Sequence, residues 1–147
     1  MIGQNDSKIR TFIDTGVLIA TARGETNEMF QRAFAILDDP NRLFVSSDFV
    51  RLELMPKPVF NRRTEEVAFY IDFFDATGDW VDSSAELIDQ AYDYGCRFGL
   101  SAFDSLHIAA ASLAGADEFV TTERIHSPLL RVPASVVLVR TIHSTRP

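Results

Sequence analysis

The chain has 147 residues, close to the commonest domain size, and we expect residues 1–147 to form a single domain. Hydrophobic residues make up 46% of the sequence and charged residues 24%, which excludes a disordered chain, and no apolar run approaches the roughly 20 residues that span a bilayer. The net charge of −7 excludes nucleic-acid binding by overall positive charge, and the single cysteine, Cys96, excludes an intrachain disulfide or a multi-cysteine zinc site.

Short apolar runs alternate with helical patterns along the chain. In chain order, the hydrophobic periodicity predicts a strand at 9–13, a buried run at 17–20 that turns into a helix, a helix over 29–37, a strand at 43–45, a helix carrying residues 49–54, a helix from residue 64, a strand at 80–81, a helix at about 83–97, a helix from 101 until Gly115, and strands at 119–122 and 136–139. This alternation predicts an α/β fold, a three-layer sandwich with a mainly parallel central sheet.

Two pairs of residues have the spacing of a capping box, in which a serine and an acidic residue three positions later close the first turn of a helix. Ser83 with Glu86 would open the helix that Gly99 ends, and Ser101 with Asp104 would open the next. We therefore expect Ser83 and Ser101 to be N-caps.

The helix from residue 64 carries more apolar residues than one core face needs. Its stripe at i, i+3, i+4 and i+7 is widened by two further phenylalanines, Phe69 and Phe73. The stripe itself consists of Val67, Tyr70, Ile71 and Phe74. We expect the surplus apolar surface, at Phe69 and Phe73, to contact a partner.

Four acidic residues take positions where a site of such a fold would form, because ligands bind beyond the carboxyl ends of parallel strands. Asp14 ends the first strand, and Glu53 follows the second. Asp104 opens a helix, and Glu123 follows the strand at 119–122. The four acids are therefore candidate ligands of one site.

Each of these acids also has a purely structural explanation. Asp14 fits the N-cap of the following helix, Asp104 fits the capping box, and Glu123 fits a solvated loop. Glu53 lies four residues before Lys57, which is the spacing of a surface ion pair. Taken one at a time, the acids do not distinguish a site from caps and surface charges.

The order and spacing of the segments around these acids are more specific. The segments are FIDTGVLI at 12–19, RLEL at 51–54, FDSLHIAAA at 103–111 and VTTE at 120–123. Over nearly the whole chain they resemble the acidic motifs of the PIN-domain nucleases, in particular the small bacterial VapC-like toxins. Two positions depart from that pattern, because the family most often has aspartate in place of Glu123 and often has serine or asparagine in place of Gly16.

The resemblance implies a metal-dependent ribonuclease that hydrolyses RNA phosphodiester bonds, the toxin of a type II toxin–antitoxin pair. A cluster of carboxylates suits Mg²⁺ or Mn²⁺ better than zinc, and the bound ion would activate a water. Asp14, Glu53 and Asp104 would be the catalytic metal ligands. Glu123 would take a weaker, outer position in the same set, because glutamate has a longer reach. The hydroxyls of Thr15 and Thr121 would orient water or a carboxylate.

Basic residues gather beside the helix that carries Glu53. We expect Arg51, Lys57, Arg62 and Arg63 to form a local basic lip that binds RNA, with a solvated surface as the alternative. His107 lies one turn into an apolar helix, where packing or a local hydrogen bond is expected rather than general-base catalysis.

Partners and location follow from the same features. The surplus apolar surface of the helix from residue 64 would bind a second copy of the chain, as a homodimer, or a cognate antitoxin. The mostly polar start MIGQNDSKIR has no apolar region of an export signal, so we expect a cytoplasmic protein without a membrane segment. The alternative function is a catalytically weak or inactive PIN-like module that acts through protein or RNA binding.

Overall fold

The computed structural model describes residues 7–24 and 27–143 and contains five strands and seven α-helices in that part of the chain. The strands are β1 (Ile9–Ile13), β2 (Arg42–Ser47), β3 (Asp79–Val81), β4 (Glu118–Thr121) and β5 (Leu138–Thr141). The helices are α1 (Thr15–Ala22), α2 (Glu28–Leu37), α3 (Asp48–Leu54), α4 (Pro56–Phe60), α5 (Thr64–Asp75), α6 (Ala85–Phe98) and α7 (Ala102–Leu113), and a 3-10 helix, η1 (Pro128–Arg131), precedes β5. None of the described helices is both long and apolar enough to cross a bilayer.

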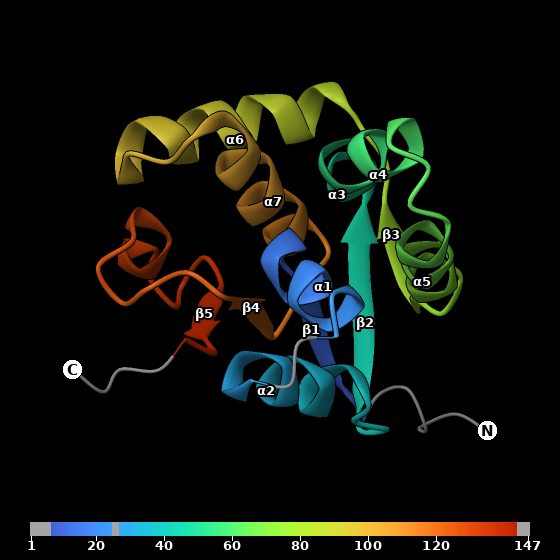
Figure 1. The fold of residues 1–147 in the computed structure, drawn as a ribbon. Helices are drawn as coiled ribbons and strands as arrows, with labels where there is room; N and C mark the ends of the chain where they lie inside the picture. The colour runs from blue at the N-terminus through green and yellow to red at the C-terminus, as the bar shows by residue number, and fades with distance from the viewer. Residues whose placement is uncertain (1–6, 25–26, 144–147) are drawn as a thin grey trace.

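The five strands form one parallel sheet in the order β3-β2-β1-β4-β5, flanked by helices (Figure 1). The predicted α/β sandwich with a parallel sheet is therefore confirmed. From β1 the chain moves outward to β2 and β3, and later returns to the other side of β1 to add β4 and β5. The direction of winding thus switches between β1 and β4, the place where open parallel sheets bind ligands beyond their carboxyl ends.

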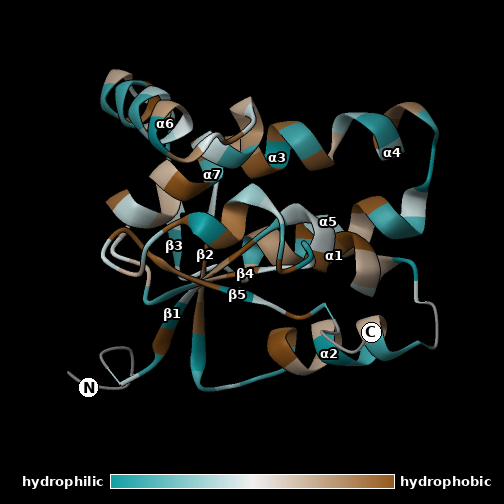
Figure 2. Cartoon of the chain, turned by 90° about the vertical axis from the view of Figure 1, so that its left-hand side faces the viewer, coloured by the Kyte–Doolittle hydropathy of each residue, from teal (hydrophilic) through white to brown (hydrophobic). Residues whose placement is uncertain are grey.

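Apolar side chains of β1, β4 and α7 build the core behind this switch point. Phe12 of β1 stacks on Phe119 of β4 with ring centroids 5.3 Å apart. Helix α7 contacts β2 and β4 and buries residues 107–111, three of which are alanines whose small side chains allow close packing on the sheet. Helix α6 packs on α7 as an outer helix, and Figure 2 shows hydrophilic residues along it.

Several element boundaries differ by a few residues from the predicted ones, and three of the differences have a clear physical reason. Pro56 ends α3 as predicted but also starts the short helix α4, because the first residue of a helix needs no amide donor. The N-cap of α6 is Ser84 rather than Ser83, and the amide of Ser83 instead donates to Asp48 Oδ2 at 2.9 Å. Strand β5 starts two residues later than predicted, since the buried Val137 packs into the core before the strand begins.

Helix α5 places its apolar residues differently from the prediction. Phe73 is only 8% exposed and lies 5.8 Å from the ring of Phe44, and Phe69 is half-buried against the core. Ile71 is 45% exposed instead. The expectation that Phe69 and Phe73 form the surplus surface is wrong for Phe73, which is buried with Tyr70, whereas Phe69 is half-buried and Ile71 is the exposed apolar residue.

Candidate metal centre

Asp14 lies directly after β1, at the switch point of the sheet, and is 6% exposed. Both of its carboxylate oxygens accept hydrogen bonds, Oδ1 from the amide of Thr15 at 2.9 Å and Oδ2 from the hydroxyl of Thr121 at 2.8 Å. Burial raises the pKa of Asp14 to about 6, against the opposing effects of the His107 charge and the Thr121 hydrogen bond. The residue is thus the N-cap of α1 and a buried carboxylate at the sheet edge.

Glu53 extends from α3 toward the same place. Its Oε1 accepts hydrogen bonds from Thr15 Oγ1 at 2.7 Å and from His107 Nε2 at 3.0 Å. The hydrogen bond from His107 holds the pKa of Glu53 below its usual value. In the described chain Glu53 pairs with His107, and the surface ion pair with Lys57 does not form.

His107 is completely buried on α7, with its ring between Phe12 and Phe103 at centroid distances of 6.1 and 6.0 Å. His107 packs in the core as expected, but its hydrogen bond is not local, because it reaches Glu53 of α3, a candidate metal ligand 54 positions away. Sequence reasoning therefore left His107 out of the site. One sequence signal pointed to it, because His107 lies three residues after Asp104 and so shares its helix face.

The three residues form a compact donor set. One carboxylate oxygen each from Asp14 and Glu53 and one ring nitrogen of His107 all lie within 4.8 Å of one another. Carboxylate oxygens are the ligands that hard divalent cations such as Mg²⁺ and Mn²⁺ prefer, whereas imidazole is a typical ligand of zinc, copper, iron and nickel. The donor set therefore fits a divalent cation, and the two carboxylates are the part of it that the sequence predicted.

Asp104 lies beside this set without belonging to it. Its backbone amide donates to the N-cap hydroxyl of Ser101 at 3.3 Å, so the predicted serine cap is confirmed. Burial raises the pKa of Asp104, and the charge of Glu53 acts in the same direction. The charge of Asp104 in turn raises the pKa of Asp14. Asp104 thus lies within electrostatic range of Asp14 and Glu53.

Glu123 is exposed in the segment after β4, and its carboxylate is not part of the donor set. Its backbone is fixed: the amide donates to Thr121 Oγ1 at 3.1 Å, and the carbonyl accepts from Thr141. The described structure therefore brings Asp14 and Glu53 together and leaves the side chain of Glu123 apart from them.

The four basic residues expected to bind RNA separate into different surroundings. Lys57 and Arg63 line a cavity of about 440 Å³ that also reaches Thr15 and Glu53. Arg51 borders another groove of α3 and α4, and Arg62 borders an apolar groove between α4 and α5.

A third basic residue, Arg23, lines the cavity beside Glu53, and sequence reasoning missed it. Arg23 lines it together with Thr15 and Ile19, which precede it at four-residue intervals on one face of α1. That spacing was the available signal, but Arg23 is 30 positions from Glu53 in the chain and does not belong to the basic group near α4.

Comparisons with known proteins agree with this architecture. The family model described as the PIN domain matches residues 11–127. None of the curated proteins compared with the chain matches it.

Several solved structures have the same fold. VapBC2 from Rickettsia felis, bound to a DNA fragment from its promoter, is 14% identical, with a TM-score of 0.68 over 90% of this chain and 98% of that one. The sarcin-ricin loop cleaving toxin VapC20 of Mycobacterium tuberculosis is 19% identical, with a TM-score of 0.58 over 74% and 86% of the two chains. A toxin–antitoxin complex from Klebsiella pneumoniae is 16% identical, with a TM-score of 0.58 over 77% and 86%. At these identities the likeness is one of fold.

Proposed function

The chain belongs to the PIN-domain family, and on that premise we propose that it is a metal-dependent endoribonuclease that hydrolyses RNA phosphodiester bonds. The observation that carries the proposal is the pair of carboxylates at the β1–β4 switch point, where an oxygen of Asp14 and an oxygen of Glu53 lie within 4.8 Å of each other and of a ring nitrogen of His107. A buried carboxylate held close to a second one carries a repulsive cost that a cation removes.

We propose Mg²⁺ or Mn²⁺ as the cofactor, held by Asp14 and Glu53 with Asp104 beside them and Glu123 in an outer position. When bound, such a cation activates a water and offsets negative charge on the phosphate oxygens. Thr121 fixes one oxygen of Asp14, and Thr15 fixes one oxygen of Glu53, so each hydroxyl orients a carboxylate.

The RNA-binding surface that we propose is the cavity beside Glu53. Lys57, Arg63 and Arg23 line it, and they would neutralise backbone phosphates next to the candidate metal centre. Two acids, Glu53 and Glu66, also line the cavity, and Arg63 pairs with Glu66 at 3.7 Å, so the cations exceed the acids there by one charge on a chain whose net charge is −7. Arg51 and Arg62 lie outside the cavity, so we expect a smaller contribution from them.

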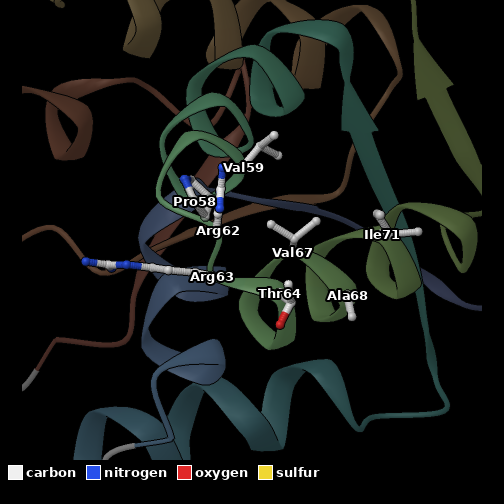
Figure 3. A pocket seen from close by; sticks show the side chains of 8 residues that line it. All are labelled: Pro58, Val59, Arg62, Arg63, Thr64, Val67, Ala68 and Ile71. Atoms are coloured by element: carbon white, nitrogen blue, oxygen red, sulfur yellow. The ribbon is translucent and has the colours of Figure 1, made fainter.

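We propose that the protein is the toxin of a type II toxin–antitoxin pair and that a cognate antitoxin covers the groove between α4 and α5. The Klebsiella pneumoniae structure similar to this chain is a toxin–antitoxin complex, which supports this role. The groove, about 460 Å³ in volume, is shown in Figure 3, where Val59 faces Val67 and Arg63 extends away from them. Apolar side chains bordered by Arg62 and Arg63 fit an apolar segment flanked by acidic residues.

A homodimer is the other assembly that we propose. Helix α6 exposes Ile88 at 47% and Tyr92 at 77%, four residues apart on one face. An apolar stripe of this kind is suited to an isologous contact between two copies. Light scattering of the purified chain tests it, and a monomer at all concentrations would contradict it.

The function is tested by incubating a total-RNA pool with the purified chain, with and without Mn²⁺. We expect cleavage by wild type only with the cation, and none by Asp14→Asn. Equal cleavage by both proteins would show that Asp14 is not part of the active site. A non-cleaving PIN-like module is the second candidate, favoured by the exposed position of Glu123, and it predicts RNA or protein binding without cleavage in either condition.

A further inference from the structure

The carboxylate of Glu53 is held by two other elements, although the residue lies on an exposed part of α3. Thr15 Oγ1 of α1 and His107 Nε2 of α7 both approach the same oxygen, Oε1, at 2.7 and 3.0 Å. Across residues 7–24 and 27–143, no hydrogen bond reaches the other oxygen, Oε2. One oxygen is thus fixed, and the other is available.

The surroundings of His107 show which ring nitrogen donates to Glu53. Its Nδ1 is buried and has no hydrogen-bond partner in the described structure, whereas Nε2 faces an ionised carboxylate oxygen. Because Nε2 lies 3.0 Å from a carboxylate oxygen, which can only accept, the N–H on Nε2 donates to Glu53 Oε1. Phe12 and Phe103 flank the ring and fix its orientation.

We propose that His107 and Thr15 form a two-donor clamp on Glu53 Oε1 that leaves Oε2 for the cation, which makes His107 a positioning residue of the metal centre. The inference rests on the proposed metal-dependent function and adds to it how the site is assembled. A glutamate on an exposed helix otherwise samples many rotamers, and binding a cation would have to select one of them. Donors that orient a ligand in this way typically change metal affinity by roughly 10–100-fold when they are removed.

The test measures the affinity of the full chain for Mn²⁺ alone, by electron paramagnetic resonance of the free ion, without RNA. His107→Phe keeps an aromatic ring but removes the donor, and His107→Gln restores an N–H at a similar reach. Thr15→Val and Thr15→Ser form the matched pair on the other side. We expect roughly 10–100-fold weaker binding for the Phe and Val variants and recovery of most of that loss for the Gln and Ser variants.

The Glu53→Gln variant is the background in which we test whether His107 acts on Mn²⁺ binding through Glu53. If His107 acts through Glu53, then His107→Phe lowers Mn²⁺ affinity in wild type but has little further effect in Glu53→Gln. Because Thr15 is not in the core, its variants test the clamp even if His107→Phe lowers stability, which melts in chelator monitor separately.

The outcomes separate the clamp from the proposed function. Mn²⁺ binding by wild type that is unchanged in both His107→Phe and Thr15→Val overturns the clamp and leaves the metal site standing. Loss in His107→Phe and His107→Gln alike, with Thr15→Val unaffected, would make His107 itself a ligand and also overturn the clamp. A wild type that binds no Mn²⁺ overturns the proposed metal centre and the clamp together, whereas Mn²⁺ binding without RNA cleavage overturns only the nuclease activity.

Discussion

Asp14 combines two roles that the sequence presented as alternatives. As an N-cap it accepts from the amide of Thr15, and as a candidate ligand it lies within reach of Glu53 and His107. The two roles are compatible because a carboxylate has several lone pairs, and a hydrogen bond leaves others for a cation. Residue type and position were sufficient to find Asp14, since a cap at the end of a buried strand is a local feature.

The burial of Asp14 predicts how the stability of the metal-free protein depends on pH. Its pKa is about 6 in the folded chain and near the ordinary value of 3.8 when unfolded, so the folded state binds the proton more tightly. The contribution is present below about pH 4 and is lost as the pH rises through about 6, by roughly 2–3 kcal/mol.

Urea denaturation in chelator at a series of pH values measures this effect. Asp14→Asn is the control, because asparagine still caps a helix but does not titrate. Wild type should lose stability relative to Asp14→Asn between about pH 4 and 7. Parallel pH curves for the two proteins would mean that Asp14 is not a buried, protonatable carboxyl.

Gly16, one of the two departures from the family pattern, has a steric reason in the fold. A Cβ at this position would collide with Thr122 Oγ1. We predict that Gly16→Ala in the wild type costs stability or gains none, whereas in Thr122→Ala the same change stabilises by up to about 1 kcal/mol through helix propensity. Chemical denaturation of the four proteins gives the coupling, and an equal effect of Gly16→Ala in both backgrounds would contradict it.

At the scale of elements, helix α7 shows what local patterns revealed and what they could not. The Ser101 cap and the apolar character of α7 follow from neighbouring residues and were predicted correctly. The hydrogen bond from His107 to Glu53 joins α7 to α3 across 54 positions, and no periodicity within either helix reports it. This hydrogen bond depends on how α3 and α7 pack on the sheet, which neither helix sequence encodes by itself.

Asp104 at the start of α7 gives a prediction that distinguishes a ligand from a cap. Burial raises its pKa, so its charge is unfavourable in the metal-free fold, and Asp104→Asn should leave stability in chelator unchanged or higher. With excess Mn²⁺, wild type should gain about 2.7 kcal/mol at a concentration a hundredfold above the dissociation constant, and the variant much less. Thermal melts in both conditions measure this, and the same Mn²⁺ response in both proteins would leave Asp104 a capping residue only.

Across the whole molecule, the parallel sheet was predictable because short apolar strands alternate with helices. The distribution of the basic residues between the cavity and the groove was not predictable from the sequence. Lys57 and Arg63 face the cavity with Glu53, while Arg62 borders the apolar groove, although Arg62 and Arg63 are neighbours in sequence. Arg63 thus lines both the cavity and the groove, whereas Arg62 lines the groove and not the cavity, and this difference depends on how α4 and α5 pack.

This division predicts the salt dependence of RNA binding. Replacing Lys57 and Arg63 together by alanine should weaken binding similarly across sequences and flatten the log-log salt slope by roughly one to two units. Arg62→Ala is the matched control and should leave the slope close to that of wild type. Equal effects of Arg62→Ala and Arg63→Ala would show that the cavity beside Glu53 does not hold the phosphates.

The most direct measurement is a calorimetric titration of the purified chain with Mn²⁺, in the absence of RNA. The donor set at the β1–β4 switch point predicts saturable binding by wild type and much weaker binding by Asp14→Asn and Glu53→Gln. Asp72→Asn, which removes an exposed acid from α5, should bind as wild type does. Equal binding by wild type, Asp14→Asn and Glu53→Gln would contradict a metal centre at this site.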